Sequence, residues 1–211
     1  SNIRPSMEQI NNLLNDFKGI ISQKPPNYSA IKINGKRAYK IARSGGVPSL
    51  VTRKVKVLDF KLLKIIDEDT AEFFIKCEKG TYVRSLIRDL GRKLGVLAHL
   101  KELHRCSVGN FNEKKAISLD IIQKVAQSSA ENNVILPIQI PLGKMKEFEV
   151  SENYSKKLIN GIKIPIEKFE NYKKISELKD GEVFYTVFLN NLIAICIVES
   201  GMIKPKRVFN G

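Results

Sequence analysis

The sequence predicts an α+β fold in two parts, and three observations support this prediction. Residues 6–125 alternate between helical and strand-like spacings of apolar side chains. The run 127–133 is polar and has no apolar period, which is typical of a linker. Beyond it, residues 183–198 have the pattern of a hairpin in a β-rich module. We therefore expect a first domain at 1–128, a linker at 129–134 and a small β-rich domain at 135–211.

The first predicted element is an amphipathic helix that begins after Ser6. Ser6 and Gln9 have the spacing of a capping box, and apolar residues recur on one face as far as Phe17. Pro25-Pro26 excludes helix, because proline has no N–H to donate and forces the preceding residue into extended geometry. A short strand, a tight turn and a short helix are predicted next, at 30–33, Asn34-Gly35 and 36–43.

Alternating apolar residues then predict two strands, at 55–65 and 71–77, with an irregularity near Asp59. The clearest helix is predicted at 83–94, where apolar residues recur on one face and Gly95 ends the element. The remaining predicted elements are short helices at 98–103, 118–125 and 151–160, and strands at 183–189 and 192–198 joined by a turn at Asn190-Asn191.

The composition is that of a globular protein. Hydrophobic residues make up 43% of the 211 and charged residues 27%, which excludes a wholly disordered chain. No window is long and apolar enough for a membrane span, and the first residues lack a signal-peptide pattern. The three cysteines are widely spaced and odd in number, which favours a reducing compartment. We expect a soluble cytoplasmic protein.

The charge is strongly positive, with 36 Lys and Arg against 22 Asp and Glu and a net charge of +14. Residues 1–130 hold 24 of the basic and 12 of the acidic side chains, so this part carries most of the charge. Between Phe17 and Leu58 there are ten basic residues and no acidic one. Such a concentration of positive charge is expected of a nucleic-acid-binding protein. The alternative is a lysine-rich surface that is only solvated.

The most informative motif is Lys-Gly-Thr-Tyr-Val-Arg-Ser-Leu at 79–86, at a predicted strand-to-helix junction. Gly80 permits a close approach of the chain, and Thr81 is a typical helix cap. Tyr82 and Arg84 fall in the first helical turn, where the helix N-terminus favours anions. An aromatic face beside a cation suits a stacked base or a carboxylate. The alternative is a capped helix with Tyr82 half-buried in the core.

Three segments together resemble the TruB-type tRNA pseudouridine synthases. They are the Pro-Pro loop and basic stretch at 23–43, the Lys-Gly-Thr-Tyr-Val-Arg motif at 79–84 and the Leu-x-Arg element at 103–105, in the family's order and spacing. The resemblance covers about residues 6–120. It implies part of a mixed, largely antiparallel pseudouridine-synthase sheet with flanking helices. The small β-rich domain at 135–211 resembles the family's PUA-like RNA-binding module only loosely.

This resemblance implies isomerisation of uridine 55 in the T loop of tRNA to pseudouridine, with no metal or organic cofactor. In the family an aspartate is the nucleophile. By motif match, Tyr82 stacks on the flipped target base, Arg84 pairs with that aspartate, and Leu103 helps to wall the pocket. Lys79 and Arg105 are then expected to contact phosphates or support the site.

The resemblance also makes the basic stretch at about 18–53 a thumb-like loop that grips the T arm of tRNA. Its cations are interleaved with Tyr28 and Tyr39, which suits folded RNA read through phosphates and splayed bases. Alternatively, these tyrosines pin the loop to the core. The predicted RNA-binding residues are Lys32, Lys36, Arg37, Tyr39, Arg43, Arg53, Lys79 and Arg105.

The family's glycine-flanked Leu-Asp-Pro motif, which carries the nucleophile, is absent from the 211 residues. Asp59 lies in a predicted strand without the proline, and Asp89 lies on the helix after Arg84, so we expect neither to be the nucleophile. We therefore expect a C-terminal fragment of such an enzyme that binds RNA as a monomer but is inactive by itself.

Three points stay open: the role of His104, the role of the basic end at 204–207 and the class of protein. His99 and His104 are five residues apart, off the spacing of ligands on one helix face, so we expect no metal. His104 stands where the family usually has arginine, and it either weakens a phosphate contact or is a surface histidine. The basic end at 204–207 either contacts RNA or is a solvated tail. The alternatives to the enzyme are a non-catalytic RNA-binding or RNA-chaperone module of the same ancestry, and a basic protein with an unrelated hydrolytic or structural role.

Overall fold

The computed structural model describes residues 2–127, 135–170 and 172–209. The chain forms two compact units, one up to His104 and the other from Arg105 onward. The predicted linker at 129–134 lies outside the described residues. Helices and antiparallel strands occur in both units, so the α+β prediction is confirmed. Among the described residues, no helix has the length and apolar character needed to cross a bilayer.

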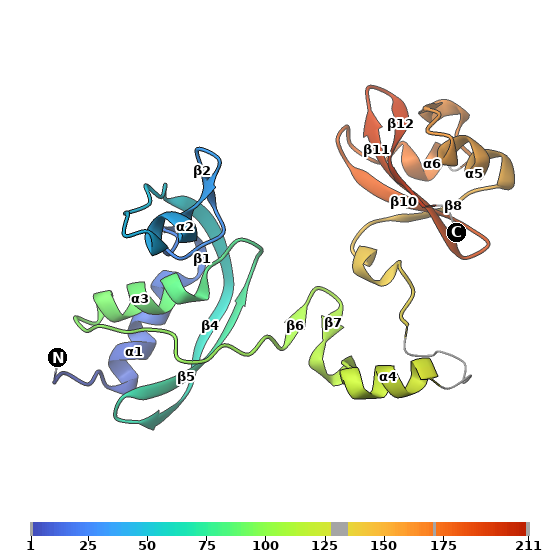
Figure 1. Ribbon diagram of the computed structural model, residues 1–211. Helices are drawn as coiled ribbons and strands as arrows, with labels where there is room; N and C mark the ends of the chain where they lie inside the picture. Colours follow the sequence, from blue (N-terminus) through green and yellow to red (C-terminus); the bar gives the residue numbers. More distant parts are fainter. Residues whose placement is uncertain (1, 128–134, 171, 210–211) are drawn as a thin grey trace. The chain divides into compact units, whose positions relative to one another are not determined.

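The first unit is built on a three-stranded antiparallel sheet in the order β1-β4-β5, with α1 and α3 on one face (Figure 1). Its principal elements are α1 (Met7–Leu14), the 3₁₀ turn η1 (Asn15–Phe17), β1 (Gly19–Gln23), β4 (Arg53–Asp67), β5 (Thr70–Cys77) and α3 (Val83–Lys93). Strand β1 was not predicted from the sequence, whereas β4, β5 and α3 were.

The core of this unit forms where the apolar faces of α1 and α3 meet the sheet. Ser6 and Gln9 form the predicted capping box, which satisfies two backbone N–H groups at the start of α1. The Phe17 ring meets the fully buried Phe60 ring of β4 edge to face at 6.1 Å. The buried members of this core are Ile10, Leu14, Phe17, Val57, Phe60, Leu86, Ile87 and Leu90.

Strand β4 is irregular at the predicted place. Its pairing with β5 shifts register between Val57 and Asp59, so an extra residue interrupts the ladder there. The Asp59 carboxylate lies 2.8 Å from the Lys61 ammonium and 3.5 Å from that of Lys18. The hydrogen bond from Lys61 lowers the pKa of Asp59 below its ordinary value.

A basic excursion leaves the sheet between β1 and β4. It consists of β2 (Lys32–Ile33), β3 (Lys36–Arg37) and α2 (Ala38–Arg43). Asn34 and Gly35 both have positive φ, 47° and 79°, which is the geometry of a type I′ hairpin turn. The helix predicted at 36–43 therefore begins two residues late, because Lys36 and Arg37 pair with β2 instead.

The helix predicted at 98–103 is wrong. Residues 97–106 contain no regular element, and the chain turns back over α3 after Gly95. The Val96 N–H donates to the Gly91 carbonyl at 2.9 Å, and a Cβ on Gly91 would lie 2.7 Å from the Cβ of Ala98. The extended chain packs here because Gly91 has no side chain, and Ala98 and Leu100 join the core.

The second unit contains a five-stranded sheet in the order β8-β10-β11-β12-β9, in which β8 is parallel to β10 and the other pairs are antiparallel. The strands of the second unit, inside and outside this sheet, are β6 (Ser107–Val108), β7 (Phe111–Asn112), β8 (Glu147–Glu149), β9 (Ile164–Pro165), β10 (Val183–Phe188), β11 (Asn191–Glu199) and β12 (Met202–Val208). Its helices are α4 (Leu119–Gln127), α5 (Glu152–Ile159) and α6 (Tyr172–Ile175), with 3₁₀ turns at Glu113–Lys115, Ile140–Leu142 and Ile166–Lys168.

Two predictions about the second unit need correction. The β10–β11 hairpin is confirmed, but its turn centres on Leu189 and Asn190, which have φ of 47° and 64°, and Asn191 already belongs to β11. Residues 204–207 form part of β12, not a tail after a strand. Pairing of β12 with β11 provides the backbone partners that hold this basic segment in the sheet.

Candidate functional site

The turn between β5 and α3 presents the predicted motif residues at the start of a helix. Gly80 has φ of 86°, a left-handed conformation that favours glycine. Thr81 is not the helix cap that the sequence predicts, because its hydroxyl donates back to the Glu78 carbonyl at 2.9 Å and closes the turn. Tyr82 takes the N-cap position, with extended backbone and no side-chain capping bond. Arg84 follows in the first helical turn.

Tyr82 is held by residues from two strands. The Tyr82 N–H donates to Oε1 of Gln23 at 2.8 Å, and Nε2 of Gln23 donates to the Tyr82 carbonyl at 3.1 Å. The Arg53 guanidinium lies 5.0 Å from the centroid of the Tyr82 ring. Arg53 also donates to the Gly80 carbonyl. Tyr82 is thus half-buried, with its backbone bonded to Gln23 and its ring next to Arg53. This partly fits the alternative prediction of a tyrosine that packs into the fold.

Three donors on α3 bind the Pro-Pro loop. Nη2 of the exposed Arg84 donates to the Tyr28 carbonyl at 3.0 Å. The buried Ser85 hydroxyl donates to the Lys24 carbonyl at 2.9 Å, and Nη2 of Arg88 donates to the same carbonyl at 3.0 Å. These bonds place the loop directly against α3, the helix whose N-cap is Tyr82.

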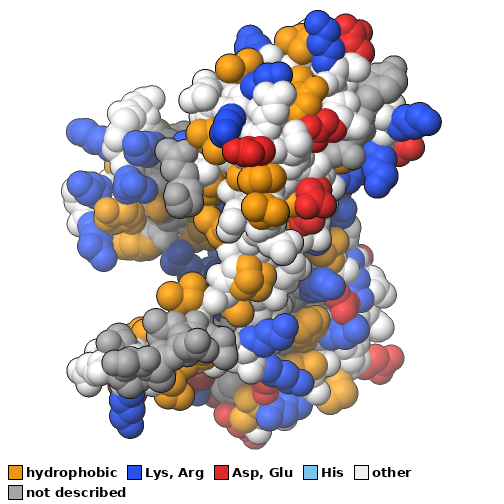
Figure 2. All heavy atoms as spheres, turned by 90° about the vertical axis from the view of Figure 1, so that its right-hand side faces the viewer, with side chains coloured by type: hydrophobic (Ala, Val, Ile, Leu, Met, Phe, Trp, Pro, Cys, Tyr) orange, Lys and Arg blue, Asp and Glu red, His pale blue; other side chains and the backbone are white. Residues whose placement is uncertain are grey.

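The basic excursion presents most of its predicted cations to solvent. Lys32, Lys36, Arg37 and Arg43 are exposed, while Tyr39 is half-buried with the Arg43 guanidinium 5.6 Å from its ring centroid. Tyr28 is 55% exposed, so this tyrosine does not pin the loop to the core. On the side drawn in Figure 2, Lys and Arg side chains lie among Asp, Glu and apolar side chains.

Arg53 connects this excursion to the Tyr82 turn. Lys32 and Arg53 both line a cavity of about 410 Å³ between the β2 hairpin and the segment that enters β4. Nε of Arg53 is buried and has no hydrogen-bond partner among the described residues. Lys79 is exposed and adjoins Gly80 in the turn.

Leu103 and Arg105 lie on the irregular chain after α3. Leu103 is 58% exposed in the described structure, so the first unit by itself does not bury it in a pocket wall. Arg105 is exposed and is the first residue of the second unit. The structure therefore places Arg53 at the Tyr82 ring and Arg84, two residues further along, on the Tyr28 carbonyl, and it leaves Leu103 exposed.

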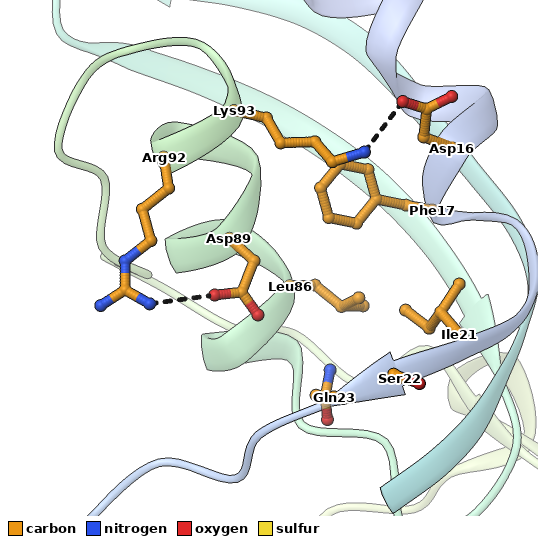
Figure 3. Close-up of a pocket in the computed structure, with 9 residues that line it drawn as sticks. All are labelled: Asp16, Phe17, Ile21, Ser22, Gln23, Leu86, Asp89, Arg92 and Lys93. Carbon is orange, nitrogen blue, oxygen red and sulfur yellow. Dashed lines mark hydrogen bonds and ion pairs between the residues drawn. The ribbon is translucent and has the colours of Figure 1, made fainter. Parts of the chain in front are cut away.

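A second cavity, of about 420 Å³, lies between β1 and α3 (Figure 3). At its rim the Lys93 ammonium lies 2.9 Å from the Asp16 carboxylate and 5.1 Å from the Phe17 ring centroid. The Asp89 carboxylate accepts two bonds from the Arg88 guanidinium, at 2.8 and 2.9 Å. Gln23 lines this cavity, and its amide bonds the Tyr82 backbone.

Two family models cover the first two thirds of the chain. The one described as TruB family pseudouridylate synthase (N terminal domain) matches residues 1–83. The one described as tRNA pseudouridylate synthase B C-terminal domain matches residues 84–142. Proteins named tRNA pseudouridine synthase B are similar over the whole chain. That of Ehrlichia canis (strain Jake) is 35% identical over 213 residues, which cover 100% of this chain and 69% of that protein.

The chain belongs to the TruB family of pseudouridylate synthases. The tRNA pseudouridine synthase B of Caulobacter vibrioides is 34% identical over 210 residues, which cover 99% of this chain and 68% of that protein. This TruB-family chain thus spans roughly two thirds of the length of its curated relatives.

Solved structures agree in fold. A chain in the "Crystal Structure of a Cbf5-Nop10-Gar1 Complex" matches with a TM-score of 0.73 and 22% identity, over 99% of this chain and 64% of that one. A chain in the "Structure of H/ACA RNP bound to a substrate RNA containing 2'-deoxyuridine" matches with a TM-score of 0.71 and 20% identity, over 100% and 63% of the two chains. The TruB-family chain therefore spans less than two thirds of these solved chains, whose likeness concerns the fold.

Proposed function

We propose that this chain binds the T arm of tRNA and holds uridine 55 for isomerisation to pseudouridine. The observation that carries the proposal is the bond from Arg84 to the Tyr28 carbonyl at 3.0 Å. It joins α3, whose N-cap is Tyr82, to the loop that leads into the exposed basic excursion. An RNA gripped by that excursion would be delivered beside Tyr82 and Arg84.

The chemistry divides among few residues. The glycosidic N1–C1′ bond of the uridine breaks, the base rotates, and C5 bonds to C1′ of the same sugar; C5 loses its proton and N1 gains one, so no atom is gained or lost overall. Tyr82 stacks on the flipped base and its hydroxyl is the candidate proton acceptor. Arg84 pairs with the nucleophilic aspartate, and Leu103 covers the base once RNA is bound. Lys79 and Arg105 contact phosphates. The reaction needs no cofactor or metal.

In this proposal the nucleophilic aspartate is not one of the 211 residues. Asp59 is engaged by Lys61 and Lys18, and Asp89 by the Arg88 guanidinium, so both carboxylates already serve as ion-pair partners. We propose that the 211 residues by themselves bind RNA as a monomer without turning it over. We propose that the enzyme acts in the cytoplasm, where its tRNA substrate would be found.

The test compares binding of this polypeptide to a T-arm hairpin and to a hairpin of equal length with a scrambled loop, across a salt series. We expect both affinities to fall with salt and the preference for the T arm to persist, because only phosphate contacts are salt-sensitive in this way. Equal affinities at every salt concentration would overturn T-arm recognition and leave a nonspecific RNA-binding module.

A further inference from the structure

Gln23 is a polar side chain buried at the end of β1. It is 1% exposed, and both polar groups of its amide are used on one residue, Tyr82. The amide accepts from the Tyr82 N–H and donates to the Tyr82 carbonyl, as a neighbouring strand would. The Tyr82 carbonyl also accepts from the Ser85 and Leu86 N–H groups, so Gln23 and the first helical turn together fix the backbone from which the ring projects.

Arg53 lies directly opposite Gln23. The two are register partners in the antiparallel β1–β4 pair, so their side chains leave the same face of the sheet. Arg53 reaches the other parts of the same turn, donating to the Gly80 carbonyl and placing its guanidinium 5.0 Å from the Tyr82 ring centroid. A planar guanidinium over an aromatic face is attracted to the ring in a way that a lysine ammonium does not reproduce.

We propose that the Gln23–Arg53 cross-strand pair positions Tyr82 for stacking on the target base. Gln23 sets the backbone, and Arg53 covers one face of the ring and leaves the opposite face to the base. Both are positioning residues that act through Tyr82. This inference rests on the proposed function and adds to it the groups that orient the stacking residue.

The experiment uses the 211-residue chain and a T-arm hairpin with 5-fluorouridine at the target position. The ¹⁹F chemical shift reports stacking of that base, and fluorescence anisotropy of a labelled hairpin reports affinity. The wild-type chain should shift the ¹⁹F signal, and Tyr82→Leu should abolish that shift. If the wild-type chain gives no Tyr82-dependent shift, the proposed function fails, and the positioning role fails with it.

With that shift established, Gln23→Ala and Arg53→Lys test the pair. Each should lose at least about half of the Tyr82-dependent shift. Gln23→Ala should change the affinity by no more than about threefold, because it removes no charge from the RNA-binding surface. Ser85→Ala is the matched control. It removes the buried hydrogen bond from the Ser85 hydroxyl to the Lys24 carbonyl and leaves the contacts of Gln23 and Arg53 with Tyr82 in place. It should keep the shift. Full shifts in Gln23→Ala and Arg53→Lys would overturn the inference.

Gln23→Glu keeps the test decisive if the alanine variant does not fold. An ionised carboxylate accepts from the Tyr82 N–H but repels the Tyr82 carbonyl, whereas the protonated acid restores the donor. We expect the ¹⁹F shift to be small at pH about 8 and to recover towards pH about 5, since burial raises the pKa of a carboxyl. A shift that does not respond to pH in this variant, while circular dichroism shows the chain folded, would contradict the role of the donated bond.

Discussion

Arg84 donates from Nη2 to the backbone carbonyl of Tyr28, 56 residues earlier in the chain, at 3.0 Å. This bond uses only part of the guanidinium, which has five N–H donors, and the side chain remains exposed. One side chain is therefore able to hold the loop and also meet a carboxylate that approaches from solvent. This dual use leads to the first prediction.

Arg84→Ala should lower turnover by roughly 10²–10³-fold in a TruB-family enzyme that carries this chain together with the family's aspartate, because the charge partner of the nucleophile is lost. RNA affinity should fall by less than about tenfold, since one exposed cation is removed. Single-turnover kinetics on a tRNA substrate, with binding measured separately, give both numbers. A near-normal rate constant would remove Arg84 from the site.

Tyr82→Phe and Tyr82→Leu separate stacking from proton transfer. Phenylalanine keeps the ring next to Arg53, so substrate binding should stay within about threefold of wild type, while loss of the hydroxyl slows turnover by roughly 10²-fold or more. Leucine removes the ring as well and should also weaken capture of the flipped base. Unchanged turnover in both variants of the aspartate-containing enzyme would show that Tyr82 lies outside the chemistry.

Lys36→Ala combined with Arg37→Ala should flatten the salt dependence of T-arm binding. Each neutralised phosphate contributes about −0.7 to −0.9 to the slope of log affinity against log salt, so the double variant should lose about 1.5 from its magnitude. Lys173→Ala with Lys174→Ala is the control, because it removes the same charge from exposed positions of the second unit. Equal slopes in the two double variants would mean that the excursion does not grip RNA.

The sequence was sufficient for the elements whose apolar residues follow a simple period. Leu86, Ile87 and Leu90 lie on the buried side of α3 because a 3.6-residue repeat puts them there, and the pattern can be seen without a structure. Gln23 gave no such signal. A buried glutamine has no periodicity, and its importance depends on the register with Arg53 and on contact with a residue 59 positions later.

The same limit explains the errors at Thr81 and at 98–103. Thr81 is a good cap by residue type, but the left-handed turn at Gly80 directs its hydroxyl to Glu78, so the cap position falls on Tyr82. Residues 98–103 have helix-compatible side chains, yet contact with Gly91 holds the chain extended over α3. In both cases a tertiary contact overrides a local preference.

Gly91→Ala tests that packing. The added methyl group would lie 2.7 Å from the Cβ and 2.8 Å from the backbone nitrogen of Ala98, so the crossing chain must move. We expect a loss of about 1–3 kcal/mol in the free energy of unfolding of the first unit, although alanine is the better helix former. Urea unfolding followed by circular dichroism measures it. A stabilised variant would show that the close crossing is absent in solution.

The second unit should lose stability at high pH. The Tyr185 hydroxyl donates to the Glu147 carboxylate, and this bond together with burial raises the pKa of Tyr185 from 10.0 to about 12. The folded state therefore holds the phenolic proton more tightly than the unfolded state. The resulting stability is fully present below the unfolded pKa near 10 and is lost as pH rises towards about 12.

Burial raises the pKa of the Cys196 thiol to about 12 as well, which adds a loss of stability of the same sign. Urea midpoints should fall across this range, and Tyr185→Phe should remove the tyrosine's share of the fall and leave that of Cys196. An identical pH dependence in wild type and Tyr185→Phe would show that the Tyr185–Glu147 bond does not form in solution.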